Sequence, residues 1–235
     1  AFLLYAVAGG LAQIVGTVLL VALFAYRNFA VGTTYSKTET IQTALFGIIV
    51  LGDHLSLGAF LAILISLAGV IAISMAQSHL TLGAFWRSLG DKPTLMGIGS
   101  GACYGIAAVC YRAASLSLDH PDFLVSAGYT LVAVLTIQTA VMTALLAARH
   151  RAELRVALRT WRVSSLVGLA GALASIGWFT AMTLEKVAYV RALGQVELIF
   201  GVLVSALVLR ERVSGREVAG MAVLAVSIAM IVLVA

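Results

Sequence analysis

Charged residues are scarce in this sequence: Asp, Glu, Lys and Arg make up 11% of its 235 residues, whereas hydrophobic residues make up 62%. Soluble globular domains average about 25% charged and 45–50% apolar residues. With a mean hydropathy of +1.07, a chain of this length cannot hide its apolar surface in one water-soluble core. The composition predicts an integral membrane protein, so the lipid bilayer is its first expected partner.

Cysteine and proline are also rare, with two residues of each. Cys103 and Cys110 lie on one face of an apolar run and are expected to pack as small hydrophobes, while the four histidines are scattered over different connections. We therefore expect no metal site and no cofactor. The P-loop, G-x-S-x-G and H-E-x-x-H motifs are absent, so nothing indicates ATP-driven transport or a hydrolase. The basic residues behind the net charge of +5 occupy short connections between apolar runs, which argues against a nucleic-acid partner.

The apolar residues fall into runs long enough to cross a bilayer, which takes about 20 residues per helix. Backbone groups must pair internally in hydrocarbon, so each run predicts an α-helix and the fold class is an all-α, polytopic transmembrane bundle. Eight spans are predicted, at 2–26, 29–51, 57–76, 94–112, 123–148, 163–184, 188–209 and 215–235.

An internal repeat relates the two ends of the chain. Shifting residues 1–77 by 158 positions lays them on the last 77 residues without a gap, and Glu39 then falls on Glu197. The first three spans match the sixth, seventh and eighth, so the copies are five spans apart and cross the membrane in opposite directions. Inverted repeats of this kind characterise many secondary transporters.

The repeat also predicts the domain organisation. We expect a first repeat at 1–77, a connection at 78–93 and a second repeat at 94–235. The fourth and fifth spans have no counterpart before residue 1, so the intact protein is expected to have ten helices, of which the first two precede this sequence.

Basic residues predict the orientation. One set of connections carries eleven Lys or Arg and the other carries three, and the richer set is expected in the cytoplasm. The first set is Arg27, Arg87, Lys92, Arg149, Arg151, Arg155, Arg159, Arg162, Arg210, Arg212 and Arg216, and the second is Arg112, Lys186 and Arg191.

Two glutamates near the middle of their spans, Glu39 and Glu197, are the leading candidates for a functional site. A charge inside the bilayer is costly, so such residues usually face a cavity or a partner. Each lies on a stripe of small or polar residues that lets helices approach closely, including Ser36 in the first copy. We hypothesise that the two acids flank a site at mid-depth, where they bind a cationic group or exchange a proton. The alternative is that each acid is neutral or paired and only joins helices.

Lys37 lies two residues before Glu39, about 200° around the helix, and its repeat counterpart is Gln195. Contact with an anionic substrate group and structural pairing with an acid are both open for Lys37. Arg191, near the start of its span, is expected to extend toward the membrane surface rather than to join the site. Weaker candidates for lining a cavity, for which helix–helix hydrogen bonds are the alternative, are Gln13, Tyr35, Tyr104, Gln138 and Trp178.

These features resemble the EamA-like transporters of the drug/metabolite transporter superfamily, in which each repeat carries a mid-helix glutamate-proline pair and then a Leu-Gly-Glu-Arg-like turn. The glutamate and the acid of the turn are fourteen residues apart in both copies, but Thr40 and Leu198 replace the proline. The matching strings are Thr38-Glu39-Thr40 with Leu51-Gly52-Asp53-His54, and Val196-Glu197-Leu198 with Leu209-Arg210-Glu211-Arg212.

The resemblance implies a ten-helix exporter or permease in the bacterial inner membrane that moves a small polar metabolite, amino-acid-like or drug-like. We expect secondary or facilitated transport by alternating access, with a proton or counter-solute and a homodimer left open. The alternatives are a membrane-embedded enzyme acting on lipid, for which no cluster of His, Asp or Ser is present, and a non-transporting receptor or scaffold. The expected function is therefore transport and not enzymatic.

Overall fold

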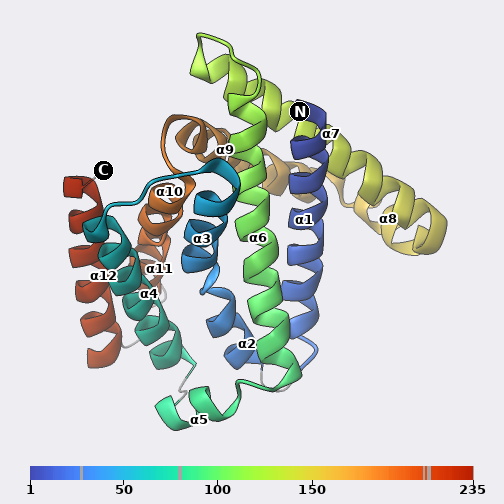
Figure 1. Ribbon diagram of the computed structural model, residues 1–235. Coiled ribbons are helices and arrows are strands. Elements are labelled where there is room, and N and C mark those ends of the chain that lie inside the picture. The colour runs from blue at the N-terminus through green and yellow to red at the C-terminus, as the bar shows by residue number, and fades with distance from the viewer. Residues whose placement is uncertain (27–28, 79–80, 209, 211–212, 235) are drawn as a thin grey trace.

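The described part of the chain folds into helices alone, as the computed structural model in Figure 1 shows. The structure describes residues 1–26, 29–78, 81–208, 210 and 213–234, and these contain no strand, which confirms the all-α class. The helices are α1 (Phe2–Leu23), α2 (Phe29–Ser36), α3 (Glu39–Leu51), α4 (Leu57–Gln77), α5 (Leu82–Arg87), α6 (Lys92–Leu116), α7 (Phe123–Arg149), α8 (Arg151–Arg159), α9 (Trp161–Leu184), α10 (Val187–Gly194), α11 (Val196–Leu207) and α12 (Gly215–Val234).

The predicted spans coincide with these helices to within a few residues. Among the described residues, seven helices are long and apolar enough to cross a bilayer, with α10 and α11 counted as one. The one predicted span that is not among these seven, 29–51, is divided into α2 and α3, which together cover its range. The polytopic membrane bundle is thus confirmed. Two short helices, α5 and α8, lie in segments that were expected to be connections.

Two spans expected as continuous helices are interrupted, which corrects the sequence-based expectation. The first break falls at Lys37–Thr38 and the second at Gln195, 158 positions after Lys37. At the first break the Lys37 and Thr38 N–H groups bond carbonyls three residues earlier, at 3.2 and 3.1 Å. The Thr38 hydroxyl also donates to the Tyr35 carbonyl at 2.7 Å. Side-chain hydroxyls that bond backward in this way bend helices, so a break forms here without proline.

Helix α6 packs along α1, α2 and α3 through glycines that face their backbones. A Cβ atom at Gly97 would overlap the Gly32 carbonyl, and one at Gly101 would lie 2.9 Å from the Ser36 oxygen. Such contacts occur where small residues let membrane helices approach closely. They hold α6 against the break between α2 and α3 and so fix the position of that break.

Helices α4 and α12 cross closely and run in opposite directions (Figure 1). Their backbones meet at two glycines: a Cβ atom at Gly69 would lie 3.1 Å from the Gly220 carbonyl oxygen, and one at Gly220 would lie 3.2 Å from that of Gly69. A shift of 158 positions takes Gly69 to Ser227, and it takes Ala62 to Gly220. All four residues are buried. The crossing is therefore made by small residues at positions that the repeat pairs.

The outer surface of the bundle is apolar. Exposed side chains include Leu4, Ile49, Val132 and Leu169, at 59–77% of their full accessibility. Apolar side chains on this scale are costly in water but favourable in hydrocarbon, so this surface fits a protein that has the bilayer as its solvent.

Candidate functional site: crossed ion pairs between two broken helices

The two helix breaks place one glutamate each at the start of a half-helix. Glu39 is the first residue of α3, and Glu197 is the second residue of α11. The N-terminus of a helix carries partial positive charge from its unpaired N–H groups, which favours a carboxylate there. In Figure 1, α2–α3 and α10–α11 run in opposite directions. The half-helices α3 and α11 therefore both begin in the middle of the bundle and run toward opposite ends of it.

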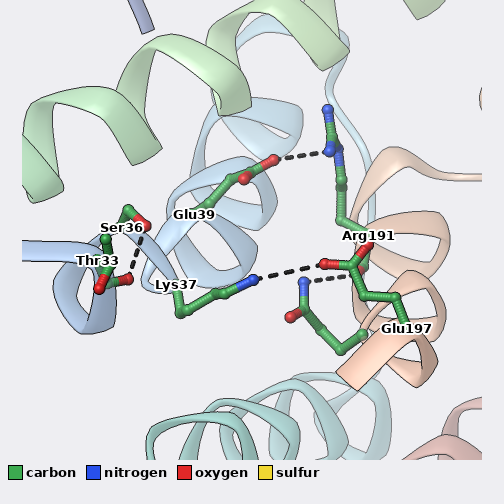
Figure 2. A network of polar contacts seen from close by, with 7 residues as sticks. Thr33, Ser36, Lys37, Glu39, Arg191 and Glu197 are labelled. Carbon is green, nitrogen blue, oxygen red and sulfur yellow. Dashed lines mark hydrogen bonds and ion pairs between the residues drawn. The ribbon is translucent and has the colours of Figure 1, made fainter. Parts of the chain in front are cut away.

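Each glutamate pairs with a cation from the other broken helix, as Figure 2 shows. Arg191 Nη1, on α10, lies 2.9 Å from Glu39 Oε1. Lys37 Nζ, at the α2–α3 break, lies 3.4 Å from Glu197 Oε1. We call these four residues the crossed ion pairs. They join the first 77 residues to the last 77 at the two breaks.

The two pairs differ in how far they are enclosed. The side chains of Arg191 and Glu39 are 20% and 18% exposed, whereas those of Lys37 and Glu197 are 29% and 60% exposed. The Arg191–Glu39 contact is an ion pair without hydrogen-bond geometry, which leaves Glu39 Oε1 and Arg191 Nε without hydrogen bonds. The Arg191–Glu39 pair is thus more enclosed and lacks hydrogen bonds, whereas the Lys37–Glu197 pair is more exposed.

Trp178 of α9 supports the enclosed pair. Its ring lies 5.0 Å from the Arg191 guanidinium carbon, a cation–π contact. The same ring covers Gly194, where a Cβ atom would collide with it. Arg191 is therefore held between an aromatic face and the Glu39 carboxylate. This differs from the expectation that Arg191 extends toward the membrane surface, because its guanidinium group lies between the Glu39 carboxylate of α3 and the Trp178 ring of α9.

Three other predicted residues lie at or beside the breaks. The Gln195 amide nitrogen donates to the Arg191 carbonyl at 3.4 Å, and the Gln195 amide oxygen is buried without a partner. The Ser36 hydroxyl donates to the Thr33 carbonyl at 2.8 Å and so closes the last turn of α2. Tyr35 turns away instead: its ring stacks on Phe85, and its hydroxyl donates to the Phe85 carbonyl.

The remaining candidates form a second polar cluster between α1, α6 and α7. The Gln13 amide oxygen accepts hydrogen bonds from the Tyr111 hydroxyl at 2.5 Å and from Gln138 at 2.8 Å. Nearby, the hydroxyls of Thr17 and Tyr104 lie 3.0 Å apart. These residues hydrogen-bond to one another, and none of them bonds to a member of the crossed ion pairs among the described residues. Tyr111 was not among the sequence-based candidates, and only the packing of α6 against α1 and α7 brings its hydroxyl to Gln13 and Gln138.

The acidic turn after α3 lies apart from the ion pairs. Gly52 adopts a left-handed conformation, with φ of +67°, and ends α3. The Lys186 ammonium donates to the His54 carbonyl at 2.8 Å, which ties this turn to the start of α10. In the repeated turn, Leu209, Glu211 and Arg212 lie outside the described residues, as does Arg27 of the first connection.

Together, the apolar spans, the interrupted helices and the ion pairs between them are typical of polytopic membrane transporters. The sequence matches the EamA-like transporter family over residues 92–233, which is more than half of the chain. The chain belongs to this family of membrane transporters.

The wider comparisons add support for the fold alone. One solved structure, described only as a crystal structure of a protein, aligns with a TM-score of 0.59 and 16% sequence identity. The alignment covers 99% of this chain and 87% of that one. No curated protein matches the sequence.

Proposed function

We propose that this chain forms the path of a secondary or facilitated transporter that moves a small polar solute, amino-acid-like or drug-like, across the bilayer by alternating access. The observation that carries the proposal is the crossed ion pairs: both intramembrane acids lie at helix breaks, and each is matched by a cation from the other end of the chain. Discontinuous helices with half-helix ends at mid-membrane are where secondary transporters bind substrate.

The charge balance of the site favours a solute that brings its own charges. Two acids and two cations leave the crossed ion pairs neutral overall, so the empty site avoids an uncompensated charge in low dielectric. An ammonium group competes with Lys37 for the exposed Glu197, and a carboxylate of the same solute then receives the released Lys37. Protonation of Glu197 also releases Lys37, which is the route by which a proton would couple to transport. In either case, the open pair exchanges partners while the enclosed pair holds the two broken helices together.

Alternating access in this proposal follows from the two repeats, 1–77 and 94–235, joined by the connection 78–93. Their breaks are 158 positions apart, and the corresponding helices run in opposite directions (Figure 1). Opposed repeats make the two membrane faces structurally similar, so a small rocking of one repeat against the other exposes a central site to either side. The lysine and arginine bias places the richer set of connections in the cytoplasm, and the resemblance to exporters of the inner membrane favours outward movement.

The experiment begins with a thermal-shift panel of amino acids, amines and carboxylates on the purified protein, because a bound solute stabilises the folded state. Flux of each stabilising solute is then measured in proteoliposomes, in both directions, with and without a pH gradient. We expect Glu39→Gln and Glu197→Gln to abolish flux.

The matched control is Asp91→Asn, because Asp91 is an exposed N-cap residue without a side-chain cap bond and Asn is an equally good N-cap. The control should transport like the unaltered protein. If both glutamine variants transport at the control rate with the same pH dependence, the crossed ion pairs are not the transport site.

A further inference from the structure

The connection between α7 and α9 holds most of the excess positive charge of the molecule. Residues 149–162 contain five arginines and one glutamate, which leaves +4 of the net charge of +5 in fourteen residues. The arginines are Arg149, Arg151, Arg155, Arg159 and Arg162. An uncompensated charge of this density requires an anionic partner or full hydration.

The described part of the chain provides no such partner. Its ion pairs involve none of these arginines, and the only acid in the segment, Glu153, lies 3.9 Å from His150. Arg151 and Arg155 donate only through Nε, to the carbonyls of Ala147 and Arg151, one helical turn earlier. The terminal guanidinium nitrogens of both residues make no hydrogen bond or ion pair with any residue that the structure describes.

Helix α8 also carries exposed apolar side chains on both sides of its arginines. None of its residues is buried, and Val156 and Leu158 are 61% and 67% exposed. On a helix, Arg151, Arg155 and Arg159 follow at intervals of four and share one face, while Val156 and Leu158 lie to either side of it. Trp161, at the start of α9, is 61% exposed, and the Arg162 guanidinium lies 5.8 Å from its ring centre.

The position of α8 in the fold specifies the kind of partner. Single residues at His150 and Thr160 join α8 to α7 and α9, both of which are long and apolar enough to span a bilayer. Figure 1 shows α8 at the outer edge of the molecule, at the far end of these two helices. Because α8 joins two consecutive candidate spans, it is expected at the membrane surface and not in the hydrocarbon core. Arginines beside exposed Val, Leu and Trp side chains are typical of helices that lie in this interface.

We propose that residues 149–162, the arginine anchor, bind the headgroups of anionic phospholipids, with the guanidinium groups on the phosphates and Val156, Leu158 and Trp161 in the acyl boundary. This inference does not depend on what the protein transports. It assigns a lipid partner to a segment that the sequence alone predicts as a connection. It also fixes the end of α7 to the leaflet that is richer in anionic lipid.

The test measures how closely a lipid approaches Trp161. Trp86→Phe and Trp178→Phe leave Trp161 as the single tryptophan, and nanodiscs carry brominated phosphatidylglycerol or brominated phosphatidylcholine at equal mole fraction. We expect the brominated phosphatidylglycerol to quench Trp161 more strongly. One basic residue near an anionic surface contributes about a fivefold preference, so Arg151→Gln, Arg155→Gln and Arg159→Gln together should lower the preference about a hundredfold.

Two matched variants keep the test decisive if the triple variant folds poorly. Lysine at the same three positions retains the charge and should retain the preference, whereas Glu153→Gln removes the only acid and should increase it. Equal quenching by both lipids, or a full preference without the arginines, overturns the proposal. Loss of the preference in inorganic phosphate, but not in chloride of equal ionic strength, identifies a site for free phosphate and overturns it as well.

Discussion

Arg191→Gln removes the cation that faces the Glu39 carboxylate, and its cost follows from the enclosure of that pair. The two side chains are 20% and 18% exposed, with 2.9 Å between Nη1 and Oε1. Removing one partner of a buried pair costs about 3–5 kcal/mol, because the other charge remains uncompensated in low dielectric. Lys37→Gln removes the cation of the open pair, in which Glu197 is 60% exposed. Exposed pairs contribute only about 0–1 kcal/mol.

Reversible unfolding in mixed detergent micelles measures both changes. We expect Arg191→Gln to lower the free energy of unfolding by about 3 kcal/mol or more, and Lys37→Gln by about 1 kcal/mol or less. The double variant Glu39→Gln, Arg191→Gln removes both charges and should regain most of the lost stability without regaining transport. Equal losses in the two single variants would refute this reasoning, as would a double variant no more stable than Arg191→Gln.

Four further substitutions test the packing of the bundle by thermal unfolding. Gly97→Ala forces a Cβ atom into the Gly32 carbonyl and should cost about 1–3 kcal/mol. Gly128→Ala meets open space and should be neutral or stabilising by up to about 1 kcal/mol, so equal effects contradict the close approach of α6. Tyr111→Phe removes the hydroxyl that donates to Gln13 and should cost about 1 kcal/mol without abolishing flux; loss of flux at unchanged stability would assign this cluster to the site. Lys186→Met keeps the apolar stem but loses the hydrogen bond to the His54 carbonyl. Because this contact is exposed, the free energy of unfolding should fall by about 1 kcal/mol or less, and a larger loss contradicts this.

The membrane spans were readable from the sequence because apolar run length is a strong and local signal. The predicted span 123–148 became α7 at Phe123–Arg149, and 57–76 became α4 at Leu57–Gln77. The correspondence of Glu39 and Glu197 in the two repeats could also be predicted from the sequence, since a charge in an apolar run stands out. Their convergence on one site was a hypothesis, and the structure places both acids in crossed ion pairs.

The helix breaks were not readable, because the signals that predict them are absent or ambiguous. Proline is missing at both positions, and the first break depends on a Thr38 hydroxyl that bonds the Tyr35 carbonyl. A threonine in a helix makes such bonds without breaking it in many proteins. The role of Arg191 was not readable either, because its partners Glu39 and Trp178 lie on other helices and only the packing of the bundle brings them to it.

The most direct measurement of the central claim is carbodiimide labelling of Glu197 with and without a solute that stabilises the protein. Glu153 on α8 provides an internal control, because its side chain is 64% exposed and that of Glu197 is 60% exposed. If the solute binds at the crossed ion pairs, it protects Glu197 from modification and leaves the labelling of Glu153 unchanged in the mass spectrum. A solute that stabilises the protein and is transported, yet leaves the labelling of Glu197 unchanged, contradicts the account.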